Sequence, residues 1–132
     1  MGSPSERNVL GGDLEQCSVD PVTGWFRDGD CRTDPGDRGS HTICAVMTAD
    51  FLAHQTKIGN DLTTPMPGFD FPGLVPGDRW CVTARNWLIA YQDGVAAPVV
   101  LAATHEAALE LVSLDALREN AVDVPDDPGG LD

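Results

Sequence analysis

Apolar and polar positions along the chain predict a short buried strand followed by an amphipathic helix. The run HTICAVM at 41–47 is apolar and contains β-branched residues, which is typical of a buried strand. Thr48 stands at an N-cap position before 49–58, where apolar residues recur at helical spacing, and Gly59 provides a stop signal. We therefore expect a strand and a helix in direct succession.

Similar patterns recur in the second half of the chain. They predict a strand at 79–83, a helix at 84–94, a strand at 98–104, a turn at His105 and Glu106, a candidate fourth strand at 108–112, and a helix at 114–122 capped by Ser113. Strands and helices mixed at this spacing predict an α+β domain with a small sheet and about three helices. The order of the strands stays open.

A long loop separates the two strand–helix pairs. The segment 60–78 contains four prolines and three glycines and ends in a predicted type II turn at 75–78, VPGD. Loops of this length are uncommon in compact domains and are often functional. Both ends, 1–7 and 125–132, lack apolar periodicity and are expected to be mobile. The folded unit is then one compact domain over 8–124, as suits a chain of 132 residues.

The chain is strongly acidic, with 21 Asp and Glu against 8 Lys and Arg and a formal net charge of -13. On the surface expected for this length, that is one net negative charge per roughly 500 Å². Because salt screens such self-repulsion, we expect halophilic adaptation to a salty cytoplasm. A nucleic acid partner is excluded by the missing basic footprint. With no export signal and no run of 18 apolar residues, we expect a cytoplasmic protein without a membrane partner.

The four cysteines, at positions 17, 31, 44 and 81, are expected to be thiols or ligands, because disulfides are rare in the cytoplasm. A zinc site would combine Cys17, Cys31, His41 and Cys44, a recognised Cys₃His set. However, residues 41 and 44 would point to opposite faces of one strand, so this site requires His41 to precede the strand. The simpler interpretation of Cys44 is a small apolar residue in a buried strand. No cofactor is predicted, and zinc is kept as an alternative.

A thiol nucleophile is the second chemical hypothesis. Cys31 would be the nucleophile, with His41 or His105 as its base and Asp28 as a carboxylate partner. The neighbouring arginines favour the thiolate, but the more numerous aspartates of the same loop oppose it. Further candidate ligand-binding residues are Asp20, Arg27, Asn60, Asp61, Arg85, His105 and Glu106. For the adjacent Arg and Asp residues, ion pairing or solvation is the competing interpretation.

Four long motifs resemble a known family. CSVDPVTGWFRDGDC, HTICAVMTADFL, GNDLTTPMPGFDFPGLVPGDRWC and PVVLAATHEAALELVSLDALRENAVD follow one another as in the domain-of-unknown-function family DUF2237. The resemblance covers nearly everything from Asn8 to Asp123. It implies that both loops are family features, and it implies no activity, substrate or cofactor. Asp30 and Thr83 stand where similar members often have a second cysteine, which counts against a metal centre.

Three functional hypotheses stay open. The first is a small-molecule enzyme or binding protein with a polar cleft between the loops 17–41 and 60–78. The second is a structural or protein-interaction module stabilised by a metal. In the third, the domain has no site of its own and its function depends on a partner protein. Convergence of the candidate side chains in one cleft would favour the first.

Overall fold

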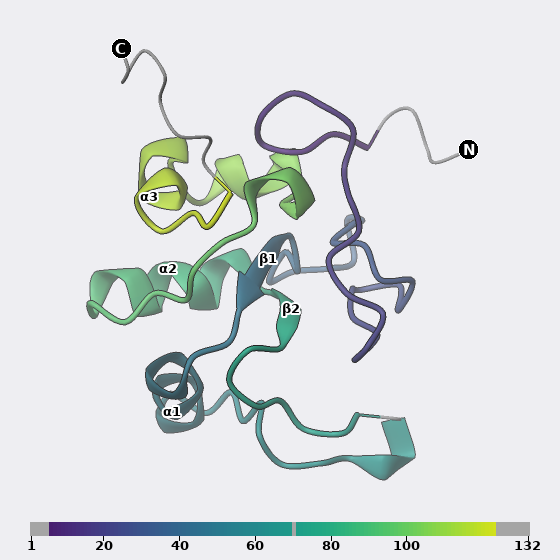
Figure 1. Ribbon diagram of the computed structural model, residues 1–132, viewed down its shortest axis with the longest axis vertical. Coiled ribbons are helices and arrows are strands. Elements are labelled where there is room, and N and C mark those ends of the chain that lie inside the picture. The colour runs from purple at the N-terminus through teal and green to yellow at the C-terminus, as the bar shows by residue number, and fades with distance from the viewer. Residues whose placement is uncertain (1–5, 70, 124–132) are drawn as a thin grey trace.

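The computed structural model describes residues 6–69 and 71–123. Within these residues it has three α-helices and one two-stranded antiparallel sheet, which confirms the predicted α+β class. In chain order the elements are β1 (Ile43–Val46), α1 (Ala49–Lys57), the 3₁₀ turn η1 (Pro67–Phe69), β2 (Arg79–Val82), α2 (Ala84–Gln92), the 3₁₀ turns η2 (Leu101–Ala103) and η3 (Glu106–Glu110), and α3 (Leu114–Glu119). In Figure 1, α1 and α2 lie on one side of the strands and the purple-blue N-terminal segment lies on the other.

The sheet separates two cores of different composition. Its register pairs Cys44 with Cys81, and side chains alternate between the two faces of each strand. The main core contains Ile43, Ala45, Trp80 and Val82 from the sheet together with Phe51, Leu52, Trp87 and Leu117 from the helices. The smaller core on the other face contains the four cysteines with Val100 and Ala103.

Hydroxyl caps fix where the helices begin, as the sequence predicts for two of them. The side-chain oxygens of Thr48, Thr83 and Ser113 accept the backbone N–H three residues further on, at 3.0 to 3.1 Å. Such a cap contributes about 1 kcal/mol. Gly59 and Gly94 follow α1 and α2 with φ angles of 93° and 80°, which a glycine adopts without strain. The third helix is shorter than the predicted 114–122: it ends at Glu119.

The predicted strands at 98–104 and 108–112 are wrong. Within these two segments, Val99 alone forms isolated bridges, to Ala45 and to Ala121. The chain then enters the 3₁₀ turn η2. The carboxylate of Asp123 accepts the N–H groups of Leu101 and Ala102 at 2.7 and 3.0 Å, so these groups do not join a sheet. The second segment overlaps η3 at 108–110, and its two leucines, Leu109 and Leu111, are exposed.

The long loop is attached to the core by three of its apolar residues, Leu62, Phe71 and Leu74. Leu74 is buried, and the ring of Phe71 packs edge-on against Trp80 with centroids 5.2 Å apart. Phe69 is 73% exposed and makes no such attachment. The predicted turn at 75–78 is present: the N–H of residue 78 donates to the carbonyl of residue 75 at 3.1 Å, and Gly77 has a φ of 99°.

The terminal segments predicted to be mobile lie largely outside the described residues. Of the segment 1–7, the structure describes Glu6 and Arg7, whose carbonyls accept the N–H groups of Leu14 and Glu106. The tail 125–132 is not described, and the domain boundaries 8–124 stay a prediction. In the part of the chain that is described, no helix has the length and apolar character needed to cross a membrane.

Candidate functional site

The cysteines form two disulfides, so the expectation of thiols or metal ligands is wrong for this structure. Cys17 is bonded to Cys44 and Cys31 to Cys81, with Cα–Cα distances of 5.7 and 5.3 Å. All four residues are buried, with exposed fractions between 0% and 4%. The cross-strand pairing of Cys44 with Cys81 places two sulfurs side by side, and the loop that begins at residue 17 supplies their partners.

Both chemical hypotheses for the cysteines change as a result. A disulfide sulfur carries no thiolate, so Cys31 is not a nucleophile in this state. His41 does precede β1, as the Cys₃His zinc set required, but the three cysteines of that set are disulfide-bonded in this structure. Cys44 lies in a buried strand, as the simpler interpretation predicted, and is disulfide-bonded there.

In the loop 17–41, Asp37 and His41 form a hydrogen-bonded pair. Nδ1 of His41 lies 2.6 Å from Oδ1 of Asp37, whose side chain is fully buried. Oδ2 of Asp37 accepts the backbone N–H of His41 at 2.8 Å and the Thr33 hydroxyl at 2.9 Å. Burial raises the pKa of Asp37, but the backbone and ring hydrogen bonds and the charge of His41, with the Thr33 bond, outweigh it, so this pKa lies below its ordinary value.

His41 differs from the other two histidines in its ring nitrogens. In His54, Nε2 contacts Asp93 at 2.8 Å and Nδ1 contacts Gln55. In His105, Nε2 contacts Glu6 at 2.8 Å and Nδ1 accepts the N–H of Ala107. Nε2 of His41 has no hydrogen-bond partner among the described residues. It is therefore the histidine nitrogen that can meet a ligand.

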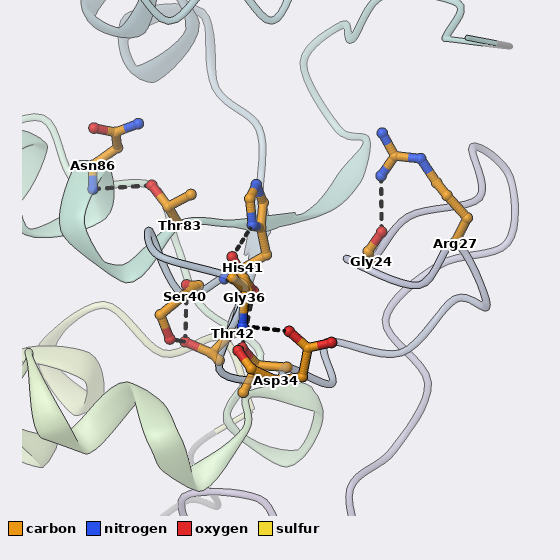
Figure 2. A network of polar contacts seen from close by, with 11 residues as sticks. Gly24, Arg27, Asp34, Gly36, Ser40, His41, Thr42, Thr83 and Asn86 are labelled. Atoms are coloured by element: carbon orange, nitrogen blue, oxygen red, sulfur yellow. Dashed lines mark hydrogen bonds and ion pairs between the residues drawn. The ribbon is translucent and has the colours of Figure 1, made fainter.

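An aromatic ring stacks on this imidazole, and a guanidinium lies over a second aromatic ring of the same region. The ring of Trp25 stacks on His41 with centroids 5.6 Å apart, and the guanidinium of Arg27 lies 4.9 Å from the ring centre of Trp80. His41, Trp80 and Asn60 line a cavity of about 40 Å³. In Figure 2 the imidazole of His41 and the guanidinium of Arg27 extend toward the same side of the loop.

A larger apolar groove lies beside this cavity, between the same two loops. It has a volume of about 420 Å³ and is lined by Val19, Asp20, Pro21, Val22, Pro65, Pro67, Phe71 and Pro72. Phe71 lines the groove and packs edge-on against Trp80, which lines the cavity. The region between loops 17–41 and 60–78 is therefore hollowed, as the first hypothesis expected, but most of its larger part is apolar.

Two residues of the loop 17–41 have an unusual backbone conformation. Arg27 and Ser40 have φ angles of 55° and 62°, and they are the non-glycine residues with positive φ in the described chain. Such conformations cost on the order of 1 kcal/mol each and occur often at functional sites. The carbonyl of Ser40 accepts the N–H groups of Thr42 and Ala84, which holds the residue preceding His41 in place. The hydroxyl contact between Ser40 and Thr42, at 3.0 Å, belongs to the network in Figure 2.

The structure places several predicted site residues in local turns or ion pairs. Asp28 accepts a hydrogen bond from Nε of Arg32 at 2.9 Å and is not part of a triad with Cys31. Asp61 accepts the hydroxyl of Thr64 and the N–H and hydroxyl of Thr63, and these bonds lower its pKa to about 2.

The remaining candidates are dispersed. Arg85 is exposed on α2, whereas His105 is buried at the start of η3 and bound to Glu6. Glu106 is exposed in the same turn. Asn60 is the candidate that the structure brings together with His41, while its side chain donates to Gln55 at 2.8 Å.

Sequence reasoning missed Asp37 as a functional residue. Asp37 lies at the end of a turn at 34–37, in which the Asp34 carboxylate accepts the N–H of Gly36 at 2.8 Å. The available signal was its spacing: Asp37 lies four residues before His41, and a turn between them can bring the two together. The role of Trp25 beside His41 had no comparable signal.

Comparison with known proteins identifies the family. A family model described as "Uncharacterized protein conserved in bacteria (DUF2237)" matches residues 7–121. The chain belongs to the DUF2237 family. A comparison with curated proteins gave no match. The loops that hold Asp37, His41 and the long Pro/Gly-rich segment all lie inside the part of the chain that matches DUF2237.

Proposed function

We propose that the protein binds a small anionic molecule between loops 17–41 and 60–78, with Arg27 and His41 as its polar contacts. The observation that carries the proposal is the pair Asp37–His41: a buried carboxylate orients the imidazole through Nδ1 and leaves Nε2 without a partner among the described residues. A protonated imidazole held in this way presents Nε2–H to an acceptor.

Charge and shape support an anionic ligand. In a chain of net charge -13, the site combines an arginine with a histidine, and the side chain of Asp37 has both oxygens engaged by His41 and Thr33. Trp25 and Trp80 offer flat apolar surfaces beside these two groups. The adjacent groove would accept an apolar portion of the same molecule.

The same arrangement would serve catalysis if the bound molecule reacts. A neutral His41 accepts a proton at Nε2, and the carboxylate of Asp37 stabilises the resulting imidazolium. No nucleophile is needed for simple binding. Binding is therefore the proposal, and acid–base chemistry is its extension.

The test uses inorganic phosphate and succinate as probes. We expect either anion to shift the Nε2 signal of His41 in a saturable way in ¹⁵N NMR spectra. His41→Gln and Arg27→Gln should each remove saturable binding when binding is measured by isothermal titration calorimetry, which does not depend on the His41 signal. The matched controls are His54→Gln and Arg85→Gln, which make the same chemical changes outside the site and should bind normally. Saturable binding that survives in Arg27→Gln, or no saturation with either anion, would overturn the proposal.

A cytoplasmic location and adaptation to high salt also stay proposals. The excess of acids over bases supports the second, because added salt would relieve repulsion across the surface. Two buried disulfides count against the first, because disulfides persist mainly in oxidising compartments. Alkylation of thiols in freshly lysed cells would decide whether the cysteines are free or disulfide-bonded inside the cell.

A further inference from the structure

The four cysteines form one cluster in the smaller core. The Sγ atoms of Cys17, Cys31 and Cys81 all lie within 4.8 Å of one another. Cys44 is bonded to Cys17 and faces Cys81 across the sheet. A tetrahedral metal ion with sulfur bonds of about 2.3 Å places its ligand sulfurs about 3.8 Å apart. The sulfurs of these three cysteines that are not bonded to each other therefore lie within about 1 Å of the spacing of ligands. Each disulfide-bonded pair, once reduced, has to separate by about 1.8 Å.

The surroundings of the cluster suit a buried thiolate site. Val100 and Ala103 pack against the cysteines and exclude water from them. Thr23 is fully buried, and its oxygen accepts the backbone N–H of Cys81 at 2.9 Å. The hydroxyl hydrogen of Thr23 has no acceptor among the described residues. It is therefore available to donate to a thiolate, as groups around metal ligands commonly do.

The geometry points to a second state of this core, in which Cys17, Cys31, Cys44 and Cys81 bind one zinc ion. Two molecules of a dithiol supply the four electrons and four protons that convert the two disulfides into four thiols, and each dithiol ends as a disulfide. Zinc then bonds to the four sulfurs and displaces their protons. Four thiolates in a tetrahedral set are a standard structural zinc site. This set replaces His41, which the sequence-based zinc hypothesis included, with Cys81.

A zinc ion would hold together the same segments that the two disulfides join. Each disulfide joins the first loop to one strand of the sheet, because Cys17 and Cys31 lie in the loop while Cys44 and Cys81 lie in β1 and β2. A zinc ion bound to all four would join the same three segments. The core thus has one covalent form for an oxidising compartment and one metal form for a reducing compartment.

The test is a cobalt titration of the full chain. The protein is reduced with dithiothreitol under argon, freed of reductant and titrated with Co²⁺, whose thiolate charge-transfer and tetrahedral d–d absorption bands report the ligands. We expect one Co²⁺ per reduced chain, full displacement by one equivalent of Zn²⁺, and no such bands with the oxidised chain. Circular dichroism measured in parallel reports folding. Either a folded reduced chain that shows no bands, or an unfolded reduced chain that zinc does not refold, overturns the proposal.

Two conservative variants test the role of the threonines around the cluster. Thr23→Val should weaken zinc binding by roughly 10- to 100-fold, as is typical when a partner of a metal ligand is lost. Thr104→Val is the matched control, because Thr104 also accepts a cysteine N–H but already donates its hydroxyl hydrogen to Val100. Equal zinc affinity in the two variants would contradict the assignment of Thr23.

Discussion

Removing the disulfide between Cys31 and Cys81 should destabilise the oxidised protein by about 4 kcal/mol. The two cysteines are separated by 50 residues in sequence, and loop-closure entropy for a loop of this size gives about 4 kcal/mol. The double substitution Cys31→Ala and Cys81→Ala removes the bond without leaving an odd thiol. The bond closes the longer of the two loops, since Cys17 and Cys44 are separated by 27 residues.

Equilibrium unfolding in urea measures this effect. With a denaturant slope of 1–3 kcal/mol/M, a loss of about 4 kcal/mol corresponds to a midpoint lower by roughly 1.3–4 M. Both proteins are measured without reductant and with a chelator, so that neither thiols nor metal ions contribute. Dithiothreitol should then lower the midpoint of the wild type by at least as much as the double substitution does. A double variant within about 1 kcal/mol of wild type would refute the argument that this bond restricts the unfolded chain.

Four further predictions concern single groups and the total charge. Gly24→Ala should destabilise the protein more than Gly94→Ala in urea unfolding: both glycines have positive φ, but only at Gly24 would the new methyl group collide with a backbone carbonyl. Thr64→Val should raise the pKa of Asp61 from about 2, because the Thr64 hydroxyl is the largest cause of its depression, and carboxyl NMR titration would show an unchanged pKa if that cause is wrong. Since the pKa of Asp37 is depressed in the folded state, its ionised form contributes stability above the unfolded value of about 3.9 that is lost as pH falls through the folded pKa. Asp37→Asn should therefore show a shallower loss of stability below about pH 4, and an unchanged acid profile would contradict this. Sodium chloride near 1 M should raise the urea midpoint of a chain with net charge -13, and a midpoint independent of salt would argue against repulsion as a cost.

The helices and the two paired strands could be predicted because their signals are local. Thr48 and Ser113 act as caps in the structure as they do in the sequence pattern, and the apolar run before Thr48 contains β1. The segment 98–104 has the composition of a strand but lacks a partner along its length. Two of its N–H groups, those of Leu101 and Ala102, bond to Asp123, a contact between residues more than 20 positions apart that no local pattern contains.

The candidate site could be predicted in location but not in its components. The two loops do border a cavity and a groove, and His41 and Asn60 do line the same cavity. The disulfides could not be predicted from spacing, because they depend on the first loop crossing the face of the sheet that carries Cys44 and Cys81. The rarity of disulfides in the cytoplasm favoured free thiols or metal ligands instead. Asp37 was missed because its burial, which makes it an orienting group for His41, is a tertiary property.

The tautomer of His41 tests the central claim most directly. Long-range ¹H–¹⁵N correlation spectra of the neutral imidazole report which ring nitrogen carries the proton. The account predicts a proton on Nδ1, donated to Asp37, and an unprotonated Nε2 open to a ligand. In Asp37→Asn this preference should weaken. A wild-type His41 with its proton on Nε2 would mean that Asp37 does not orient the ring, and it would contradict the proposed site.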